Sequence, residues 1–322
     1  MVSVLKGGGN QCFVTIGRIR NFAKKAIKSM ISENKSGSRM YLSAPLPFMG
    51  QKRRYAKAFA GVLHKFGTAP VVVDLFGGSG LLSHIAKRTL PDATVVYNDH
   101  DGYRHRIKAV SQTNALLADI RAMVTGVVAP GKGIEGAVRE RIAARIAAEA
   151  ESAGYVDYIT LSSSLLFSGR YADTLEGLLK PTWYNNVRGC DFPDCTDYLN
   201  GIEVVSCDYR RLWAKYRGVP GVVFVVDPPY LSTEVGHYDN HWGLCDYLDV
   251  LDVLQDGRYV FFTSAKSQIV ELVEWFARKG VSRSLFEGCK MVDVINSVSH
   301  NGINHDYMLV HTGCSNGAQA AI

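Results

Sequence analysis

Long apolar runs are missing from this sequence, and none approaches the roughly 18 to 20 residues that a membrane-spanning helix needs. A secretory signal is missing too, because Lys6 and the three glycines after it interrupt the N-terminus before an apolar core forms. There is also no internal repeat or low-complexity tract. We therefore expect an ordinary globular protein that has no membrane partner.

The cysteines form no recognisable set: there are seven, an odd number, and no two make a Cys-x-x-Cys pair. This pattern excludes a disulfide framework and fits the reducing cytoplasm. The nearest approach to a metal-ligand set is Cys190 and Cys195 with His237 and His241, but the cysteine spacing is loose. We expect a cytoplasmic protein that holds no metal.

Positive charge is unevenly distributed along the 322 residues, whose net charge is +6. Residues 1–40 hold eight Lys and Arg against the single acid Glu33, a local charge of +7, so residues 41–322 sum to −1. Such an arm suits contacts with nucleic-acid phosphates. A solvated basic helix explains it equally well, since the spacing over residues 11–32 predicts one amphipathic helix. We expect residues 1–40 to be a basic appendage.

The most distinctive stretch is the apolar run of residues 222–226 followed by Asp227-Pro228-Pro229-Tyr230. Five consecutive β-branched or aromatic residues predict a strand buried on both faces of a parallel sheet. The prolines end this strand, because they lack N–H donors and fix φ, so Asp227 and Tyr230 come at its carboxyl edge. Open α/β sheets bind ligands at that edge.

These four residues offer what a planar exocyclic amine needs. Its N–H groups can donate to the Asp227 carboxylate and the Pro228 carbonyl, while the ring of Tyr230 stacks on the heterocycle. The nitrogen lone pair is then freed from the ring and can attack an electrophilic methyl group in line. A strand that simply ends in a Pro-Pro turn is the alternative.

A second buried strand, residues 71–74, leads into a glycine-rich turn and a helix predicted over about 80–90. Asp74 ends the strand, and Phe76, Gly78 and Gly80 shape the turn. Glycines let a ligand press against the backbone N–H groups at a helix N-terminus. Nucleotide binders of several kinds share such a turn.

Upstream of this strand, residues 45–55 form a turn-rich segment that leads into a helix predicted over about 52–66. Phe48 offers an aromatic face, Gly50 permits close backbone approach, and Lys52 stands at the start of the helix. By themselves these residues are weak evidence for a binding site, and they become informative because the glycine turn follows them in the sequence.

Two further strands end in acidic residues. Asp99 follows the strand of residues 93–98, about 20 residues past the glycine turn, where an acid is placed to hold a ribose diol. The alternative for Asp99 is a cap on the next helix. Asp208 follows the strand of residues 202–207 and suits an acceptor for an adenine amine.

Between these two strands the regular alternation of strands and helices is interrupted. Residues 103–200 predict helices over 104–125 and 134–153, then a serine-rich loop. We interpret them as an insert between the two parts of one domain, residues 41–102 and 201–322. Aromatic, amide and basic side chains in the insert suit binding of bases and phosphates, although an irregular loop explains them too: Arg170, Tyr184, Asn185, Asn186 and Arg188.

The order of these motifs resembles that of the Dam-type (D12 class) DNA adenine-N6 methyltransferases: aromatic segment, glycine turn, acidic strand end, insert, Asp-Pro-Pro-Tyr. The resemblance covers about residues 45–312 and implies a Rossmann-like, doubly wound, mostly parallel sheet with a mostly helical target-recognition insert. It implies S-adenosylmethionine as cofactor, with Asp74 facing its amino group and Asp208 its adenine. The family's own cofactor contacts carry over to Phe48, Lys52, Asp99 and Asp227, with Phe76, Gly78 and Gly80 shaping the methionine pocket.

The implied activity is methylation of adenine N6 in double-stranded DNA by a bacterial or viral enzyme of the cytoplasm. The catalytic residues would be Asp227, Pro228, Pro229 and Tyr230, acting on a base flipped out of the duplex. Two features depart from the family. Residues 48–52 read Phe-Met-Gly-Gln-Lys where Trp-Ala-Gly-Gly-Lys is common, and the residues that read GATC are not recognisable. The target sequence is therefore not transferable.

Three alternatives stay open on the sequence. An RNA adenine methyltransferase uses the same tetrad, and the basic arm suits RNA as well. Methylation of cytosine N4 is disfavoured by the motif order. A catalytically silent nucleic-acid-binding protein on this scaffold is disfavoured by the intact tetrad and glycine turn. The sequence leaves open the oligomeric state and whether a restriction endonuclease partner exists.

Overall fold

The computed structural model describes residues 39–67, 69–229, 242–255, 257–264, 267, 269–280, 285–286, 288–299 and 302–313. Residues 1–38 of the basic arm, Tyr230, His237 and His241 lie outside these ranges, so the roles expected of the arm and of Tyr230 remain predictions. Within these ranges no helix is both long and apolar enough to cross a membrane, and no group of three or more His, Cys, Asp and Glu is arranged to hold a metal.

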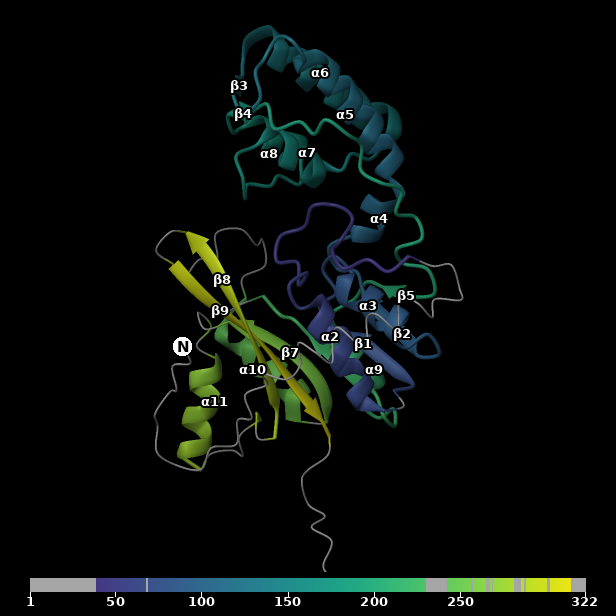
Figure 1. The fold of residues 1–322 in the computed structure, drawn as a ribbon, viewed down its shortest axis with the longest axis vertical. Coiled ribbons are helices and arrows are strands. Elements are labelled where there is room, and N and C mark those ends of the chain that lie inside the picture. Colours follow the sequence, from purple (N-terminus) through teal and green to yellow (C-terminus); the bar gives the residue numbers. More distant parts are fainter. Residues whose placement is uncertain are drawn as a thin grey trace, which may run out of the picture.

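Seven strands form one sheet in the order β5-β2-β1-β6-β7-β9-β8 (Figure 1). The parallel strands are β1 (Val71–Asp74), β2 (Thr94–Asn98), β5 (Glu203–Val205), β6 (Val223–Val226) and β7 (Arg258–Ser264). An antiparallel edge is formed by β8 (Lys290–Ser299) and β9 (Gly302–Thr312). The predicted fold class, a mostly parallel Rossmann-like α/β sheet, is confirmed.

Helices cover both faces of the sheet, because its central strands are apolar on both faces. Val223 and Val225 of β6 face a core shared with α2 (Ala56–Leu63), which a short 3-10 helix (His64–Phe66) extends, and with α3 (Leu81–Thr89). Phe224 and Val226 face the opposite core. That core is shared with α9 (Tyr209–Tyr216), α10 (Leu244–Gln255) and α11 (Ile269–Arg278).

The strand order reverses at β1. From β1 the chain moves outward through β2 to β5, and it then returns to β6 on the other side of β1. In open α/β sheets such a switch point opens the ligand-binding edge at the carboxyl ends of the strands. Asp74, the last residue of β1, and Asp227, which directly follows β6, therefore lie on neighbouring strands at this edge.

The residues between β2 and β5 are mostly helical and form one end of the molecule (Figure 1). A fully buried Trp183 and the buried Ile142 and Leu161 belong to a hydrophobic core that lies apart from the two sheet cores. The elements are α4 (Tyr103–Lys108), α5 (Val110–Val124), α6 (Gly136–Ala153), α7 (Tyr158–Leu165), α8 (Leu175–Leu179) and a hairpin of β3 (Gly133–Ile134) with β4 (Trp183–Tyr184).

The serine-rich stretch of residues 162–164 lies in α7, so the predicted loop is wrong there. Asp157 starts the helix, because its carboxylate accepts a hydrogen bond from the backbone N–H of Thr160 at 3.0 Å. Hydroxyl groups that favour loops are used inside the fold instead: Ser163 donates from Oγ to the Thr160 carbonyl at 2.7 Å. Capping and burial therefore outweigh the low helix propensity of serine.

Candidate functional site

Asp227 is placed at the site by β6 and by the two prolines behind it. The neighbouring Pro228 is buried, and the Pro229 carbonyl accepts a hydrogen bond from the hydroxyl group of Tyr247 in α10. The chain path after β6 is therefore fixed from two sides. Oδ1 of Asp227 is buried and has no hydrogen-bond partner among the described residues. A buried acceptor without a partner costs stability, and a ligand that donates to it recovers that cost.

The other carboxylate oxygen of Asp227 is paired with Lys52. Its Oδ2 lies 2.6 Å from Nζ of Lys52, and both side chains are largely buried, at 15% and 13% exposed. Burial raises the pKa of Asp227 above its ordinary value, while the Lys52 ammonium opposes that rise. The sequence assigned Lys52 to the cofactor, and the structure shows that its ammonium group contacts Asp227.

Asp74 is fully buried at the end of β1. Its Oδ2 accepts a hydrogen bond from the hydroxyl of Ser83 at 2.7 Å, and its Oδ1 has no partner among the described residues. Burial raises the pKa of Asp74 to about 7. An ammonium group beside Asp74 would favour its carboxylate form, so this acid suits the amino group of an amino-acid ligand.

The turn after β1 depends on Gly77, which packs against the ring of Tyr97 in β2. A Cβ atom at Gly77 would lie 2.2 Å from that ring, so no other residue fits without movement. Gly78 and Gly80 adopt positive φ values of 49° and 69°, which favour glycine. The Tyr97 hydroxyl donates to the Gly78 carbonyl at 2.7 Å and so fixes the turn from below.

The segment that carries Phe48 is tied to the first helices of the insert. Both the N–H and the carbonyl of Leu46 hydrogen-bond with the hydroxyl of Tyr103, at 3.0 and 3.1 Å. Arg106 donates to the Pro47 carbonyl at 2.7 Å and forms a buried ion pair with Asp157 at 2.9 Å. The insert therefore holds the segment that places the Phe48 ring beside Gly78, where a Cβ would meet that ring at 3.1 Å.

These groups enclose one small pocket at the carboxyl edge of the sheet. Asp74 lies at the end of β1 beneath the glycine turn and does not itself line the pocket. The structure brings the following predicted residues into the lining: Phe48, Lys52, Phe76, Gly78 and Asp227. The motifs that were identified separately in the sequence therefore lie together in one pocket.

Asp99 and Asp208 lie outside this lining and are used by the neighbouring helices. Both oxygens of Asp99 accept backbone hydrogen bonds at the start of α4, from Tyr103 at 2.6 Å and from Arg104 at 2.9 Å. Asp208 caps α9 by accepting from the N–H of Arg210 at 2.7 Å. For Asp99 these contacts are those of the capping alternative, whereas a capping role was not foreseen for Asp208. The ribose and adenine contacts stay predictions.

Sequence reasoning missed Asn98, the last residue of β2. Its side-chain nitrogen donates to the carbonyls of Leu75 and Cys207 at 3.0 and 2.9 Å, and its oxygen accepts from the N–H of Cys207 at 3.0 Å. Asn98 therefore ties together the ends of β1, β2 and the chain after β5. An asparagine beside Asp99 at the end of an apolar strand was the available signal.

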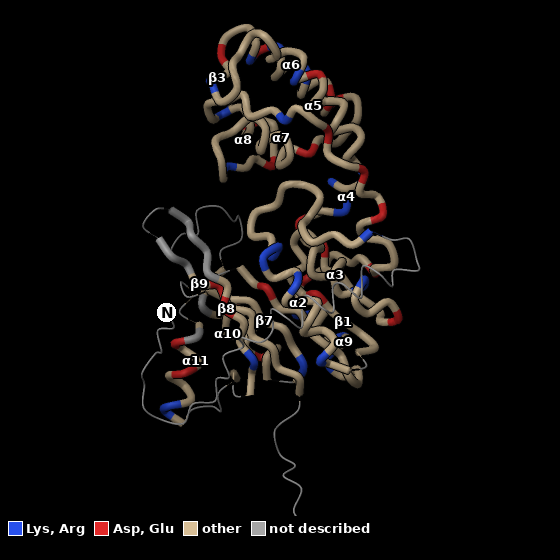
Figure 2. Tube along the Cα trace, viewed as in Figure 1, with Lys and Arg blue, Asp and Glu red and all other residues tan. Residues whose placement is uncertain are grey.

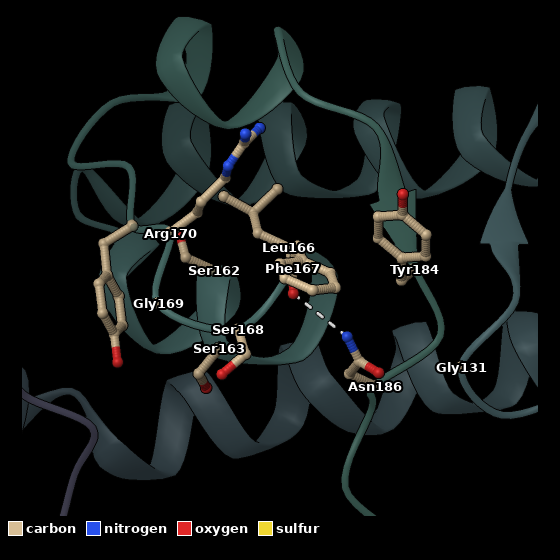
Figure 3. Close-up of a pocket in the computed structure, with 11 residues that line it drawn as sticks. Gly131, Ser162, Ser163, Leu166, Phe167, Ser168, Gly169, Arg170, Tyr184 and Asn186 are labelled. Atoms are coloured by element: carbon tan, nitrogen blue, oxygen red, sulfur yellow. Dashed lines mark hydrogen bonds between the residues drawn. The ribbon is translucent and has the colours of Figure 1, made fainter. Parts of the chain in front are cut away.

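A second pocket of about 350 Å³ lies in the insert, between α7, the loop after it and β4 (Figure 3). Its lining includes the predicted residues Arg170, Tyr184 and Asn186. Phe167 is 65% exposed, and its ring lies edge-on to that of Tyr184 at 6.2 Å. Asn186 donates from Nδ2 to the Leu166 carbonyl at 3.1 Å, the dashed line in Figure 3. Phe167 was not among the residues assigned to nucleic-acid binding from the sequence.

Two other predicted nucleic-acid contacts lie elsewhere. Asn185 is buried, and its side chain donates to the Val128 carbonyl at 2.7 Å, which supports the loop before β3. The guanidinium of Arg188 stacks on Phe192 at 4.0 Å from the ring centroid. Contact between Asn185 and a base would require its buried amide to leave the hydrogen bond with Val128. The geometry does not support this contact, which remains a prediction.

No protein-family model matches the chain. A protein of Haemophilus influenzae that bears the name "Putative methyltransferase" is 35% identical over 293 residues, which cover 89% of this chain and 97% of that protein. The chain belongs to this methyltransferase family. The similarity extends over nearly the whole relative and over most of the methyltransferase described here.

Proposed function

We propose that this methyltransferase transfers a methyl group from S-adenosylmethionine to N6 of adenine in DNA. The observation that carries the proposal is Oδ1 of Asp227, a buried acceptor for which the described part of the chain offers no hydrogen-bond partner, at the carboxyl end of β6 and in the same pocket as the glycine turn. An exocyclic amine is a donor that satisfies this oxygen. A serine or cysteine nucleophile is not needed, because the amine nitrogen itself attacks.

The described residues fit S-adenosylmethionine as cofactor. The tight turn at Gly77 and Gly78 lets a carboxylate approach backbone N–H groups. Asp74 lies beneath this turn, outside the pocket lining, and we assign the amino group to its buried Oδ1, which has no hydrogen-bond partner among the described residues. Phe48 and Phe76 supply apolar walls of the pocket. When bound, the cofactor supplies an electrophilic methyl group on a sulfonium sulfur, which leaves as a neutral thioether.

Asp227 has two tasks in this reaction. Oδ1 accepts a hydrogen bond from one amine N–H, which directs the nitrogen lone pair away from the ring and toward the methyl group. As the new N–C bond forms, the nitrogen becomes positively charged, and the adjacent carboxylate stabilises that charge. The surplus amine proton then leaves to solvent. The Pro229 carbonyl already accepts from Tyr247, and we assign the second N–H to the Pro228 carbonyl.

The insert suits the task of binding the DNA around the target. Its pocket combines the exposed Phe167 ring with the Arg170 guanidinium, a pairing that offers stacking to bases and charge to phosphates. Basic and acidic residues are mixed along α5 and α6, whereas a basic stretch directly before α2 lies on the side that faces the insert (Figure 2). Flipping the adenine out of the duplex costs a few kcal/mol, which such contacts offset.

The test is to incubate the protein with unmethylated genomic DNA and S-adenosylmethionine that carries a labelled methyl group. Digestion to nucleosides identifies the product, and long-read sequencing maps its positions. We expect N6-methyladenine at one short sequence motif. Label in RNA and none in DNA would replace the DNA substrate by RNA, label in N4-methylcytosine would replace the base, and no label in either polymer would overturn the proposal.

A further inference from the structure

The ion pair between Lys52 and Asp227 uses one oxygen of the carboxylate and leaves the other for a different partner. Oδ2 lies 2.6 Å from the Lys52 ammonium, and Oδ1 is left as a buried acceptor. Lys52 is itself anchored, because its Nζ donates to the Gly50 carbonyl at 3.1 Å and lies 5.9 Å from the centroid of the Phe262 ring. A cation that is held in place against one carboxylate oxygen restricts the carboxylate to one orientation.

Charges on the surrounding elements work against a negative Asp227. Asp306 of β9 raises the pKa of Asp227, and burial raises it more. Asp227 in turn raises the pKa of Asp74 on the neighbouring strand. Among the described groups facing the carboxylate, Lys52 is the one whose charge favours its ionised form. Without that ammonium, burial and the charge of Asp306 would raise the pKa of Asp227 unopposed by any described group.

We infer that Lys52 is a positioning residue for Asp227: it fixes the carboxylate by Oδ2, keeps it ionised, and so presents Oδ1 to the substrate amine. This inference rests on the proposed function for the identity of the amine, but the ion pair itself is independent of substrate. It changes the role carried over from the family resemblance, where Lys52 was a cofactor contact.

The ion pair matters for methyl transfer because it favours the ionised form of Asp227. A protonated Asp227 would carry an O–H donor and would lose the charge that stabilises the developing cation on the amine nitrogen. An opposite charge within about 4 to 6 Å lowers the pKa of a carboxylic acid by roughly 1 to 3 units. Removing the Lys52 ammonium should therefore move the acid limb of the rate profile to higher pH.

The experiment titrates Asp227 directly by carbon NMR in full-length protein labelled at the aspartate side-chain carboxyl. The Asp227→Asn variant assigns the signal. We expect Lys52→Met to raise the titration midpoint of Asp227 by at least about 1 pH unit, and the acid limb of kcat/KM for methylation to move in parallel. Lys52→Arg, which keeps the charge, should leave the midpoint within a few tenths of a unit.

Lys57→Met is the matched control, because Lys57 is an exposed lysine in the first turn of α2 that no described pocket uses. Lys52→Gln gives the same comparison if the methionine variant does not fold. An Asp227 midpoint that is the same in wild type, Lys52→Met and Lys52→Gln would overturn the inference. The titration needs no substrate, so it separates this inference from the proposed function, which the nucleoside assay tests.

Discussion

The Nδ1 atom of His84 lies 2.6 Å from the carbonyl oxygen of Tyr198, and the two rings stack with centroids 4.7 Å apart. On the other side of the imidazole, Nε2 accepts a hydrogen bond from the N–H of Tyr41 at 3.0 Å. These contacts require a neutral ring with its proton on Nδ1. His84 therefore joins α3, the end of the insert and the segment that leads into the pocket through one buried imidazole.

Stability should fall in acid because of His84. Burial lowers the pKa of His84 to about 4, against an ordinary value of 6.5, so only the unfolded chain binds this proton between those values. Stability from this site is complete above pH 6.5 and is lost as the pH falls toward 4, by about 3 kcal/mol. Denaturant unfolding of wild type and His84→Gln measures this. A wild-type profile no steeper than that of the variant would contradict the prediction.

Replacement of Gly77 by alanine should destabilise the protein by roughly 1 to 3 kcal/mol, because the new methyl group overlaps the ring of Tyr97. The same movement would open the glycine turn and weaken cofactor affinity. Gly189→Ala is the control, since a Cβ there meets no atom within 4 Å. Thermal unfolding and a cofactor titration test the pair, and equal stability of the two variants would show that the turn is not tightly packed.

Binding of S-adenosylmethionine should depend on pH through Asp74. Its pKa of about 7 in the free protein means that the carboxylate form, which attracts an amino group, is lost as the pH falls below 7. Affinity at pH 6 should be about 10-fold lower than its value above pH 8, and binding near pH 7 should release protons. Calorimetry in two buffers of different ionisation enthalpy detects the release. The Asp74→Asn variant should bind more weakly with a flat profile.

Asp227→Asn should lower methyl transfer at least about 100-fold, because the amide has less acceptor capacity and no charge. Its thermal stability should fall, because the largely buried Lys52 ammonium loses its carboxylate counter-charge, so activity is compared at a temperature at which the variant is folded. The exposed Asp92→Asn serves as control. Retention of more than a few per cent of wild-type turnover by Asp227→Asn would rule out its catalytic role.

The insert pocket should contribute to DNA affinity. Removal of the Phe167 ring by alanine should cost about 1 to 3 kcal/mol of binding if it stacks on a base, and Arg170→Ala should weaken binding and reduce its salt dependence. Arg141→Ala, an exposed arginine on α6 outside the pocket, is the matched control. Fluorescence anisotropy at several salt concentrations measures all three. Identical affinities for Arg170→Ala and Arg141→Ala would remove the pocket from the DNA interface.

The elements of the sheet were predictable because their signals are local. The apolar run before Asp227 had to be a buried strand, and the prolines had to end it, whatever packed around them. The strands predicted over residues 93–98 and 202–207 appear as β2 and β5. The helix at residues 158–165 was missed, because its stability comes from the Asp157 cap and from core contacts rather than from the propensity of serine.

The carboxylates of the site, its glycine turn and the positions of its strands along the chain could be predicted from residue types and their spacing. Which of these groups contact one another could be seen in the tertiary structure alone. It paired Lys52 with Asp227, and no described residue donates to the other oxygen of the carboxylate. It also used Asp99 and Asn185 for internal hydrogen bonds. Such contacts join residues far apart in the chain, and their geometry depends on how helices and strands pack, which no local pattern encodes.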